Sequence, residues 1–272
     1  MELTGKEKTI QQEAKEYIRS KKDELIETFI LSKNPLRLGF ITMFMAGSPG
    51  AGKTEFSQKY MPLIVNDKYK KLIDILSKKG INVSPTNSLF IRIDVDEVRE
   101  FLPQYQKTDM RAGVRGNSHV VQKAANDGLD ILRDYCLDNE ISFLHDGTFG
   151  NYDTMKKIVK RSIQSGREVQ IYYLYLDPLK AWEFTKAREY LEGRNIVKEK
   201  FIEQFFKSKE NVNKIKKEFG DKVKIHCVLK DDRNIPIETA FNEPDIDKYL
   251  ETKYNKGIIK RYSVEDLLTS IS

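Results

Sequence analysis

The stretch Gly47–Thr54 constrains the fold of this chain most, because it matches the pattern G-x-x-x-x-G-K-[ST] without a mismatch. Its glycines let the backbone turn tightly, so that successive N–H groups point inward and form a nest for a phosphate group. An apolar, strand-like run over 38–46 leads into this stretch, and residues 53–60 contain no glycine or proline and can begin a helix whose N-terminus faces the anion. The sequence therefore predicts a loop that binds the phosphates of a nucleoside triphosphate, formed by Gly47, Ser48, Pro49, Gly50, Ala51, Gly52, Lys53 and Thr54.

The last two residues of this loop carry its chemistry. Lys53 is expected to reach the β- and γ-phosphates of the nucleotide. Thr54 is expected to offer its hydroxyl group to Mg²⁺. The motif thus predicts a nucleoside triphosphate and Mg²⁺ as cofactors.

Composition narrows the class of protein. A chain of 272 residues, 39% of them hydrophobic, suits one α/β domain with insertions or with a small appendage. The two cysteines, Cys136 and Cys227, lie far apart and match no metal or redox spacing, which is typical of a reducing compartment. The N-terminus lacks the features of a signal peptide, and no apolar run approaches the ~20 residues that span a bilayer. We therefore expect a soluble cytoplasmic protein without a membrane partner.

The charge of the chain is moderately basic. Its 47 basic and 41 acidic residues give a net charge of +6, which fits a phosphorylated small-molecule ligand as well as nucleic acid. However, no basic tract is interleaved with aromatic residues. We therefore expect a small-molecule partner and no nucleic acid.

Strand-like and helical segments alternate along the chain. Five short apolar segments are predicted as strands, at 38–46, 89–94, 141–146, 169–176 and 223–228. Helical patterns lie near 55–79, 96–101, 118–138, 153–165, 178–192, 198–218 and 264–270. This alternation predicts an α/β fold with a five-stranded, mostly parallel sheet that helices cover on both faces. Ligands bind such sheets at the carboxyl ends of the strands, so the residues after each strand are the candidates for a site.

The predicted core runs over 38–230 and carries the phosphate-binding loop. In the segment 1–37, apolar positions at helical spacing over 6–31 predict a helix that packs on the core, although a helix that binds a partner fits the same pattern. Residues 231–272 are predicted to be a charged C-terminal extension of the same domain. Loops are predicted from composition at 80–88 and 229–240.

The second predicted strand ends in a pair of carboxylates. Asp94 and Asp96 have the period-two spacing that directs the side chains of an extended chain to one side. Beside a phosphate-binding loop, such a carboxylate can hold Mg²⁺ through water or accept the proton of an attacking hydroxyl group. We expect this role for Asp96 and a structural or supporting role for Asp94. The alternative is that Asp96 only caps a helix that begins at Glu97.

Polar residues also follow the third and fourth predicted strands. Asp146-Gly147-Thr148 places a carboxylate and a hydroxyl group where a ligand can approach closely, or forms a turn and a cap for a helix that starts near Asn151. After the fourth strand a helix is expected to stop at Gly193, with Arg188 in its last turn and Arg194 just beyond it. Two arginines at a helix end can close over a triphosphate and neutralise its charge, whereas arginines on a solvated helix surface would have no such role.

In combination these motifs resemble the zeta-toxin kinases. The resemblance spans roughly residues 38–220 and rests on Gly47–Thr54, Ile93-Asp94-Val95-Asp96-Glu97-Val98-Arg99, Leu102-Pro103-Gln104-Tyr105, Asp146-Gly147-Thr148, Ala187-Arg188-Glu189 and Glu192-Gly193-Arg194-Asn195. It implies a P-loop kinase fold and a phosphotransferase that belongs to a toxin–antitoxin system. The characterised members use ATP or GTP with Mg²⁺ to phosphorylate the 3′-hydroxyl group of UDP-N-acetylglucosamine. The resemblance therefore also implies a nucleotide-sugar substrate and an antitoxin protein as a partner.

The resemblance assigns roles to the residues at matching positions. It implies that Lys53 binds phosphate, that Thr54 is a Mg²⁺ ligand and that Asp96 deprotonates or orients the sugar hydroxyl group. It further implies substrate contacts from Arg99, Asp146 and Thr148, and catalytic phosphate contacts from Arg188 and Arg194. The chain departs from the pattern at Asp146, where several members carry a glutamate that is longer by one methylene. This departure bears on the identity of the acceptor.

Three functions are open on the sequence. The first is a zeta-toxin-like kinase that transfers the γ-phosphoryl group of ATP to a hydroxyl group of a nucleotide sugar. The second keeps the fold and replaces the acceptor with another small molecule, such as an antibiotic, a nucleoside or a sugar. The third is a nucleotide-dependent binding module without an acceptor, and the Asp96 carboxylate and the Asp146-Gly147-Thr148 step argue against it.

Overall fold

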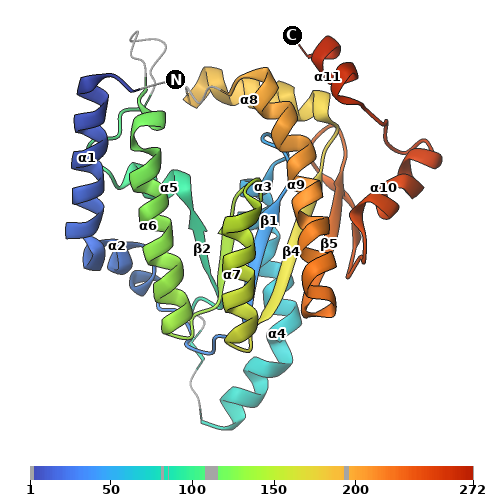
Figure 1. Ribbon diagram of the computed structural model, residues 1–272. Coiled ribbons are helices and arrows are strands. Elements are labelled where there is room, and N and C mark those ends of the chain that lie inside the picture. Colours follow the sequence, from blue (N-terminus) through green and yellow to red (C-terminus); the bar gives the residue numbers. More distant parts are fainter. Residues whose placement is uncertain (1–2, 81–82, 85, 108–115, 193–195, 272) are drawn as a thin grey trace. The chain divides into compact units, whose positions relative to one another are not determined.

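The computed structural model describes residues 3–80, 83–84, 86–107, 116–192 and 196–271 (Figure 1). The chain forms two compact units. The first comprises 1–40 and 54–145, and the second comprises 41–53 and 146–272. The segment boundaries expected after residues 37 and 230 stay predictions.

Helices make up most of the first unit. Its elements are α1 (Gly5–Ser20), α2 (Lys22–Phe29), a 3₁₀ turn (Leu31–Lys33), α3 (Lys53–Lys59, entered from the second unit), α4 (Met61–Lys78), β2 (Ile91–Asp94), α5 (Val95–Glu100), α6 (Ser118–Asp138) and β3 (Phe143–Asp146). The helices α1, α2 and α5 all pack on α6 (Figure 1). The buried face of α6 includes Val121, Ala125 and Leu132, at the spacing of an amphipathic helix.

Strands and helices alternate in the second unit. Its elements are β1 (Ile41–Ala46), α7 (Tyr152–Gln164), β4 (Glu168–Tyr175), α8 (Pro178–Glu192), α9 (Lys198–Phe219), a 3₁₀ turn (Gly220–Lys222), β5 (Val223–Lys230), β6 (Pro236–Ala240), α10 (Ile246–Asn255) and α11 (Val264–Ser270). β4 pairs in parallel with both β1 and β5, whereas β6 is antiparallel to β5. Every residue of β1 is buried, as in a parallel strand that is covered on both faces.

The strand order is β2-β3-β1-β4-β5-β6. The predicted α/β fold, with a mostly parallel sheet flanked by helices, is therefore confirmed. The predicted number of five strands is wrong, because β6 lies in a segment that composition predicts as a loop. β6 ends the sheet order and its residues are partly exposed, so it lacks the continuous apolar run of a buried parallel strand.

The N-terminal segment contains two helices where the sequence predicts a single helix over 6–31. α1 ends at Ser20, whose hydroxyl group donates a hydrogen bond to the carbonyl oxygen of Tyr17 (3.0 Å). The same carbonyl accepts the N–H of Lys21 (2.9 Å), and α2 begins at the next residue. The bond from the Ser20 hydroxyl group competes with continuation of the helix, whereas the bond from the Lys21 N–H is the last α-helical bond of α1.

The predicted charged tail contains a further helix, α10. Its first turn is capped by Asp245, whose carboxylate accepts the N–H groups of Asp247 (2.8 Å) and Lys248 (3.2 Å). Its buried positions follow helical spacing and are Ile246, Tyr249, Leu250 and Lys253. A lysine occupies one of these positions, so the sequence does not show an apolar stripe. None of the helices that the structure describes is long and apolar enough to cross a membrane.

Candidate functional site

The phosphate-binding loop joins β1 to α3 and depends on its glycines. Gly47 and Gly50 have φ angles of 136° and 74°, values that residues with a Cβ rarely adopt. A Cβ on Gly50 would lie 2.0 Å from the carbonyl oxygen of Ala181, and one on Gly47 would lie 2.5 Å from that of Leu174. Both the backbone conformation and the available space therefore require glycine at these positions.

Lys53 is folded into the loop that precedes it. Its ammonium group donates hydrogen bonds to the carbonyl oxygens of Gly47 (3.0 Å) and Ser48 (2.6 Å). The residue is 9% exposed. Phosphate oxygens that entered the loop could replace these carbonyls as acceptors without a large movement of the side chain. This placement suits the phosphate-binding role that the motif predicts.

The first N–H group of the loop is held by α9. The Gly47 N–H donates to Ser208 Oγ at 2.6 Å and to the carbonyl oxygen of Thr148 at 3.4 Å. Ser208 is fully buried on α9. Within the second unit, the predicted Asp146-Gly147-Thr148 step thus contacts the loop through its backbone.

α9 also holds the residue after this step. Asn211, one turn beyond Ser208, donates from Nδ2 to the carbonyl oxygen of Phe149 at 3.0 Å. Phe149 has a left-handed backbone (φ 60°), and its ring packs edge-on against Phe44 of β1 with 5.6 Å between the ring centroids. A bulky residue in this conformation is strained, and such strain is concentrated at functional sites.

The helix that follows the step has its own cap. Asn151 accepts the Thr154 N–H at 3.0 Å, and α7 begins at Tyr152. Asp146, which is 5% exposed, and Thr148 are therefore not the cap of this helix. Their predicted substrate contacts stay predictions.

α8 lies against the loop at Gly50. The nearest atoms to a Cβ there are the carbonyl oxygen of Ala181 and the hydroxyl oxygen of Thr185, the latter 2.5 Å away. Arg188 follows Thr185 by three residues and therefore lies on the same side of the helix. Its expected companion, Arg194, lies outside the described residues, so the arginine pair stays a prediction.

In the first unit, Asp94 is the cap of α5. Its Oδ1 accepts the Asp96 N–H at 2.9 Å, and the helix begins at Val95. The alternative in which Asp96 caps a helix beginning at Glu97 is therefore wrong. Asp94 has the structural place that the sequence predicts for it.

Arg92 connects this cap to the start of α3. Its guanidinium group forms ion pairs with Asp94 and Glu97, and its Nε donates to Ser57 Oγ at 3.0 Å. Ser57 Oγ in turn donates to the carbonyl oxygen of Thr54 at 2.8 Å. A buried polar network in the first unit thus joins the backbone of Thr54 to the N-terminus of α5.

Asp96 forms an ion pair with Arg99, with 2.7 Å between Oδ1 and NH1. The NH2 group of Arg99 also donates to Gln122 Oε1 of α6 at 2.9 Å. The Asp96 side chain keeps 26% of its surface exposed, whereas that of Arg99 keeps 8%. The ion pair orients a carboxylate that solvent still reaches. The substrate contact expected of Arg99 stays a prediction.

Thr54 is the metal ligand expected at the loop, and its hydroxyl group suits Mg²⁺. Among the described residues, no group of three or more His, Cys, Asp or Glu side chains could hold a metal ion. Mg²⁺ is commonly held by few protein ligands together with substrate phosphates and water. The partly buried hydroxyl-bearing Thr54, at the start of α3, would supply one such ligand.

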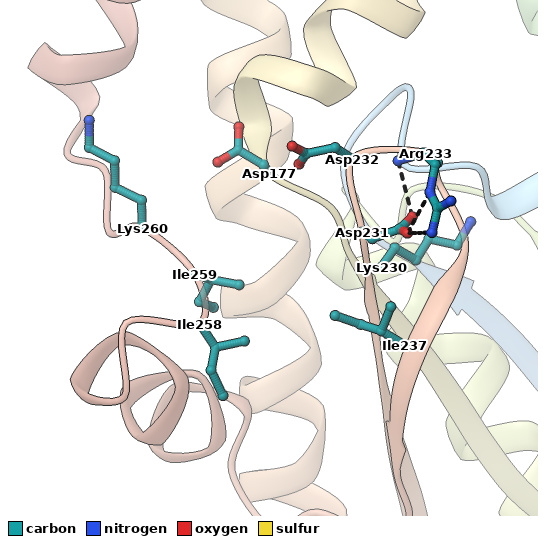
Figure 2. Close-up of a pocket in the computed structure, with 9 residues that line it drawn as sticks. All are labelled: Asp177, Lys230, Asp231, Asp232, Arg233, Ile237, Ile258, Ile259 and Lys260. Carbon is teal, nitrogen blue, oxygen red and sulfur yellow. Dashed lines mark hydrogen bonds and ion pairs between the residues drawn. The ribbon is translucent and has the colours of Figure 1, made fainter.

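A pocket of about 350 Å³ lies where β5 ends in the second unit (Figure 2). Three aspartates and three isoleucines line it together with Lys230, Arg233 and Lys260. Asp177 accepts the Leu179 N–H (2.9 Å) as the cap of α8, and Asp231 pairs with Arg233 (3.1 Å). The N–H of the residue at 235 also bonds to Asp231 and lowers the pKa of its carboxyl group. Because these two carboxylates already bond to groups of the protein, they do not indicate a particular ligand.

Some polar residues at the loop and the step were not predicted from the sequence. They are Ser208, Asn211, Lys230 and Asn234. Ser208 is 161 positions from the residue that it contacts, so no local motif could connect them. One signal was present, because Ser208 and Asn211 are polar residues within the buried, mainly apolar stripe of α9.

The zeta toxin family model matches residues 71–240 of the chain, which is more than half of its length. The match includes Asp96, Asp146 and Arg188 but begins after the phosphate-binding loop. The prediction that the loop at Gly47–Thr54 binds phosphate therefore depends on the spacing and geometry of the loop alone. No curated protein sequence matches the chain.

Solved structures share the fold. One represents the PezAT chromosomal toxin–antitoxin system of Streptococcus pneumoniae, with 16% identity, a TM-score of 0.52, and coverage of 98% of this chain and 94% of that chain. The native AvrRxo1-ORF1:-ORF2 complex shows 12% identity, a TM-score of 0.59 and coverage of 86% and 71%. The same complex with ATP shows 13% identity, a TM-score of 0.54 and coverage of 94% and 73%. At these identities the likeness shows the fold, whereas the family match shows that the chain belongs to the zeta toxin family.

Proposed function

We propose that the chain is a kinase that binds ATP and Mg²⁺ at the Gly47–Thr54 loop and phosphorylates a hydroxyl group of a nucleotide sugar such as UDP-N-acetylglucosamine. The geometry of the loop carries the proposal. Gly47 and Gly50 have the positive φ angles that a tight phosphate-binding turn needs, and the Lys53 ammonium bonds to the carbonyl oxygens of Gly47 and Ser48. Membership of the zeta toxin family supports phosphoryl transfer as the reaction.

The proposed phosphoryl transfer gives each of a few residues one role. The acceptor oxygen attacks the γ-phosphorus, the bond to the β,γ-bridging oxygen breaks, and ADP leaves with the electron pair. Asp96 orients the hydroxyl group and takes its proton, and Arg99 fixes the direction of the Asp96 carboxylate. Lys53 stabilises the charge on the β- and γ-phosphates. Thr54 would be one of the ligands of Mg²⁺, which would neutralise charge on the phosphates.

Arginine and substrate contacts complete the proposed site. Arg188, on the side of α8 that meets the loop, and Arg194 would neutralise charge on the transferring group. Asp146 and Thr148 would contact the acceptor.

Two similar structures support ATP as the nucleotide and an antitoxin protein as the partner. One AvrRxo1-ORF1:-ORF2 structure contains ATP, which favours ATP as the phosphoryl donor here. PezAT is a toxin–antitoxin system, which favours an antitoxin protein as a partner of this chain.

The test is transfer of the γ-phosphoryl group from labelled ATP, with the product identified by phosphorus NMR. UDP-N-acetylglucosamine should stimulate ADP release, and Lys53→Ala and Asp96→Asn should each reduce turnover by about 100-fold or more. Lys59→Ala at the exposed end of α3 and Asp153→Asn in the exposed first turn of α7 are matched controls that should retain activity.

The outcomes separate the three functions. Stimulation by another acceptor alone would leave a kinase with a different substrate. ADP release that no acceptor stimulates would leave a nucleotide-dependent binding module. Full activity of purified Asp96→Asn would refute the role of that carboxylate.

A further inference from the structure

Lys230, the last residue of β5, contacts the phosphate-binding loop on the side of its carbonyl oxygens. Its ammonium group donates hydrogen bonds to the carbonyl oxygens of Ala51 (3.2 Å) and Gly52 (3.1 Å) and to Asn234 Oδ1 (2.8 Å). A lysine ammonium has three N–H donors, so these three acceptors match its capacity. The residue is 4% exposed, and a buried cation needs such partners to offset its lost hydration.

These bonds fix the direction of the loop amides. In a planar trans peptide, the C=O of one residue points away from the N–H of the next. Lys230 holds the C=O groups of Ala51 and Gly52, so the N–H groups of Gly52 and Lys53 point to the opposite side. Those N–H groups belong to the nest that receives the phosphates.

Asn234 holds Lys230 in this position. It has a left-handed backbone (φ 66°), and its N–H donates to the carbonyl oxygen of Asp231 at 2.8 Å, which closes the turn after β5. A Cβ on Gly52 would lie 2.4 Å from both side-chain amide atoms of Asn234 and 2.6 Å from Lys230 Nζ. The turn therefore packs directly on the loop within the second unit.

We propose that Lys230 and Asn234 form a positioning pair that holds the loop amides in their phosphate-binding orientation and thereby sets the affinity for the triphosphate. The proposal rests on the proposed function in one respect, namely that a nucleoside triphosphate binds at this loop. Neither residue touches the reacting atoms. Their loss therefore weakens binding in the ground state and the transition state alike, which raises KM more than it lowers kcat.

The test compares Lys230→Met and Asn234→Gly with the wild type. Lys230→Met keeps the aliphatic stem and removes the donors, and glycine at 234 tolerates the left-handed backbone while removing the acceptor. Each variant should bind MgATP at least about tenfold more weakly, with kcat changed less than KM. Inorganic tripolyphosphate, measured by competition with ATP, should lose affinity by the same factor, because the pair acts on the phosphate end of the ligand.

Two residues of the second unit supply matched controls. Lys253→Met removes another buried lysine, whose ammonium pairs with Glu238 on β6, and Asn242→Gly changes another left-handed asparagine (φ 57°). Both variants should retain the wild-type affinity for MgATP, even if Lys253→Met is less stable.

Wild-type affinity of both positioning-pair variants would overturn the inference, and so would a loss of ATP affinity without a loss of tripolyphosphate affinity. If Lys230→Met does not fold, Asn234→Gly decides the question. A wild-type protein that binds no nucleotide would instead refute the proposed function itself.

Discussion

Gly50 is the residue of the phosphate-binding loop where the least space is available. Gly50→Ala should lower the affinity for MgATP by about 100-fold, because the added methyl group would overlap the carbonyl oxygen of Ala181 and displace the loop from α8. Nucleotide titration measures the affinity, and urea unfolding measures the stability.

Gly166 separates the effect of space from that of backbone conformation. Its φ of 71° is close to the 74° of Gly50, but no atom lies within 4 Å of its Cβ position. Gly166→Ala should cost about 1 kcal/mol of stability and leave MgATP affinity unchanged. Equal losses of affinity in both variants would show that space at Gly50 is not the cause.

His145 should make stability depend on pH. Burial, assisted by Arg133 of α6, lowers its pKa from 6.5 to about 3. Between these values the unfolded chain binds a proton that the native protein does not, so the free energy of unfolding falls as the pH is lowered from 6.5 towards 3. The loss is at most about 1.4 kcal/mol per pH unit.

Urea unfolding of the wild type and of His145→Gln between pH 5 and 6.5 measures this dependence. The window lies above the range in which most carboxylates titrate. The variant should lose less stability over the window than the wild type does. Parallel curves would contradict the assignment to His145.

The residues of the candidate site were predictable from the sequence to different degrees. Lys53 could be singled out because the loop motif is contiguous and its spacing has a physical reason. Ser208 and Lys230 could not, because their contacts with the loop depend on how α9 and β5 pack in the second unit. A serine or a lysine in isolation carries no information about such a contact.

At the scale of elements, Gly128 of α6 marks a close contact between helices of the first unit. A Cβ there would lie 2.7 Å from Val98 Cγ1 of α5 and 3.2 Å from Ile18 Cδ1 of α1. Gly128→Ala should therefore destabilise the protein by about 1–3 kcal/mol, although alanine favours a helix over glycine by about 1 kcal/mol. Urea unfolding measures the change.

A second substitution identifies the contact. Val98→Ala removes the nearest methyl group, so Gly128→Ala should cost less in that background, with an interaction free energy of roughly 0.5–3 kcal/mol. Gly5→Ala is the control, since no atom lies within 4 Å of its Cβ position at the start of α1. Stabilisation by Gly128→Ala alone would show that α6 has room at this point.

Elements with a continuous apolar pattern were predictable, and elements that depend on few buried residues were not. α6 and α8 begin and end at the residues that the sequence predicts. α6 shows helical spacing of its buried apolar residues, whereas Pro178 in the first turn and the stop signal Gly193 delimit α8. β6 was missed because one side of an edge strand needs no apolar partner, and Glu238 within it pairs with Lys253 of α10. The same ion pair places Lys253 on the buried face of α10, so this helix shows no purely apolar stripe in the sequence.

At the scale of the whole molecule, the exposed ion pairs contribute little to the stability of the fold. Many ion pairs join residues three or four positions apart on exposed helix surfaces, such as Lys21–Glu24, Lys180–Glu183 and Lys214–Glu210. Such pairs are screened by salt and add little. Stability comes mainly from the apolar core of each unit. A ligand that binds only the native protein adds to the free energy of unfolding.

Nucleotide binding should therefore stabilise the native protein in a way that depends on Lys53. A ligand that binds only the native state adds about 2.7 kcal/mol at 100 times its dissociation constant. Thermal unfolding with increasing MgATP should show this increase in the wild type and in Lys59→Ala, whose substituted side chain lies at the exposed end of α3. Lys53→Ala should show a much smaller increase.

Each variant must be compared with itself, with and without MgATP, because Lys53 also bonds to the carbonyl oxygens of Gly47 and Ser48 and its loss changes the unliganded protein. An equal MgATP effect in Lys53→Ala and in the wild type would place the nucleotide elsewhere than the loop. No effect in the wild type at millimolar MgATP would contradict nucleotide binding altogether, since even a dissociation constant of about 100 μM predicts more than 1 kcal/mol under these conditions.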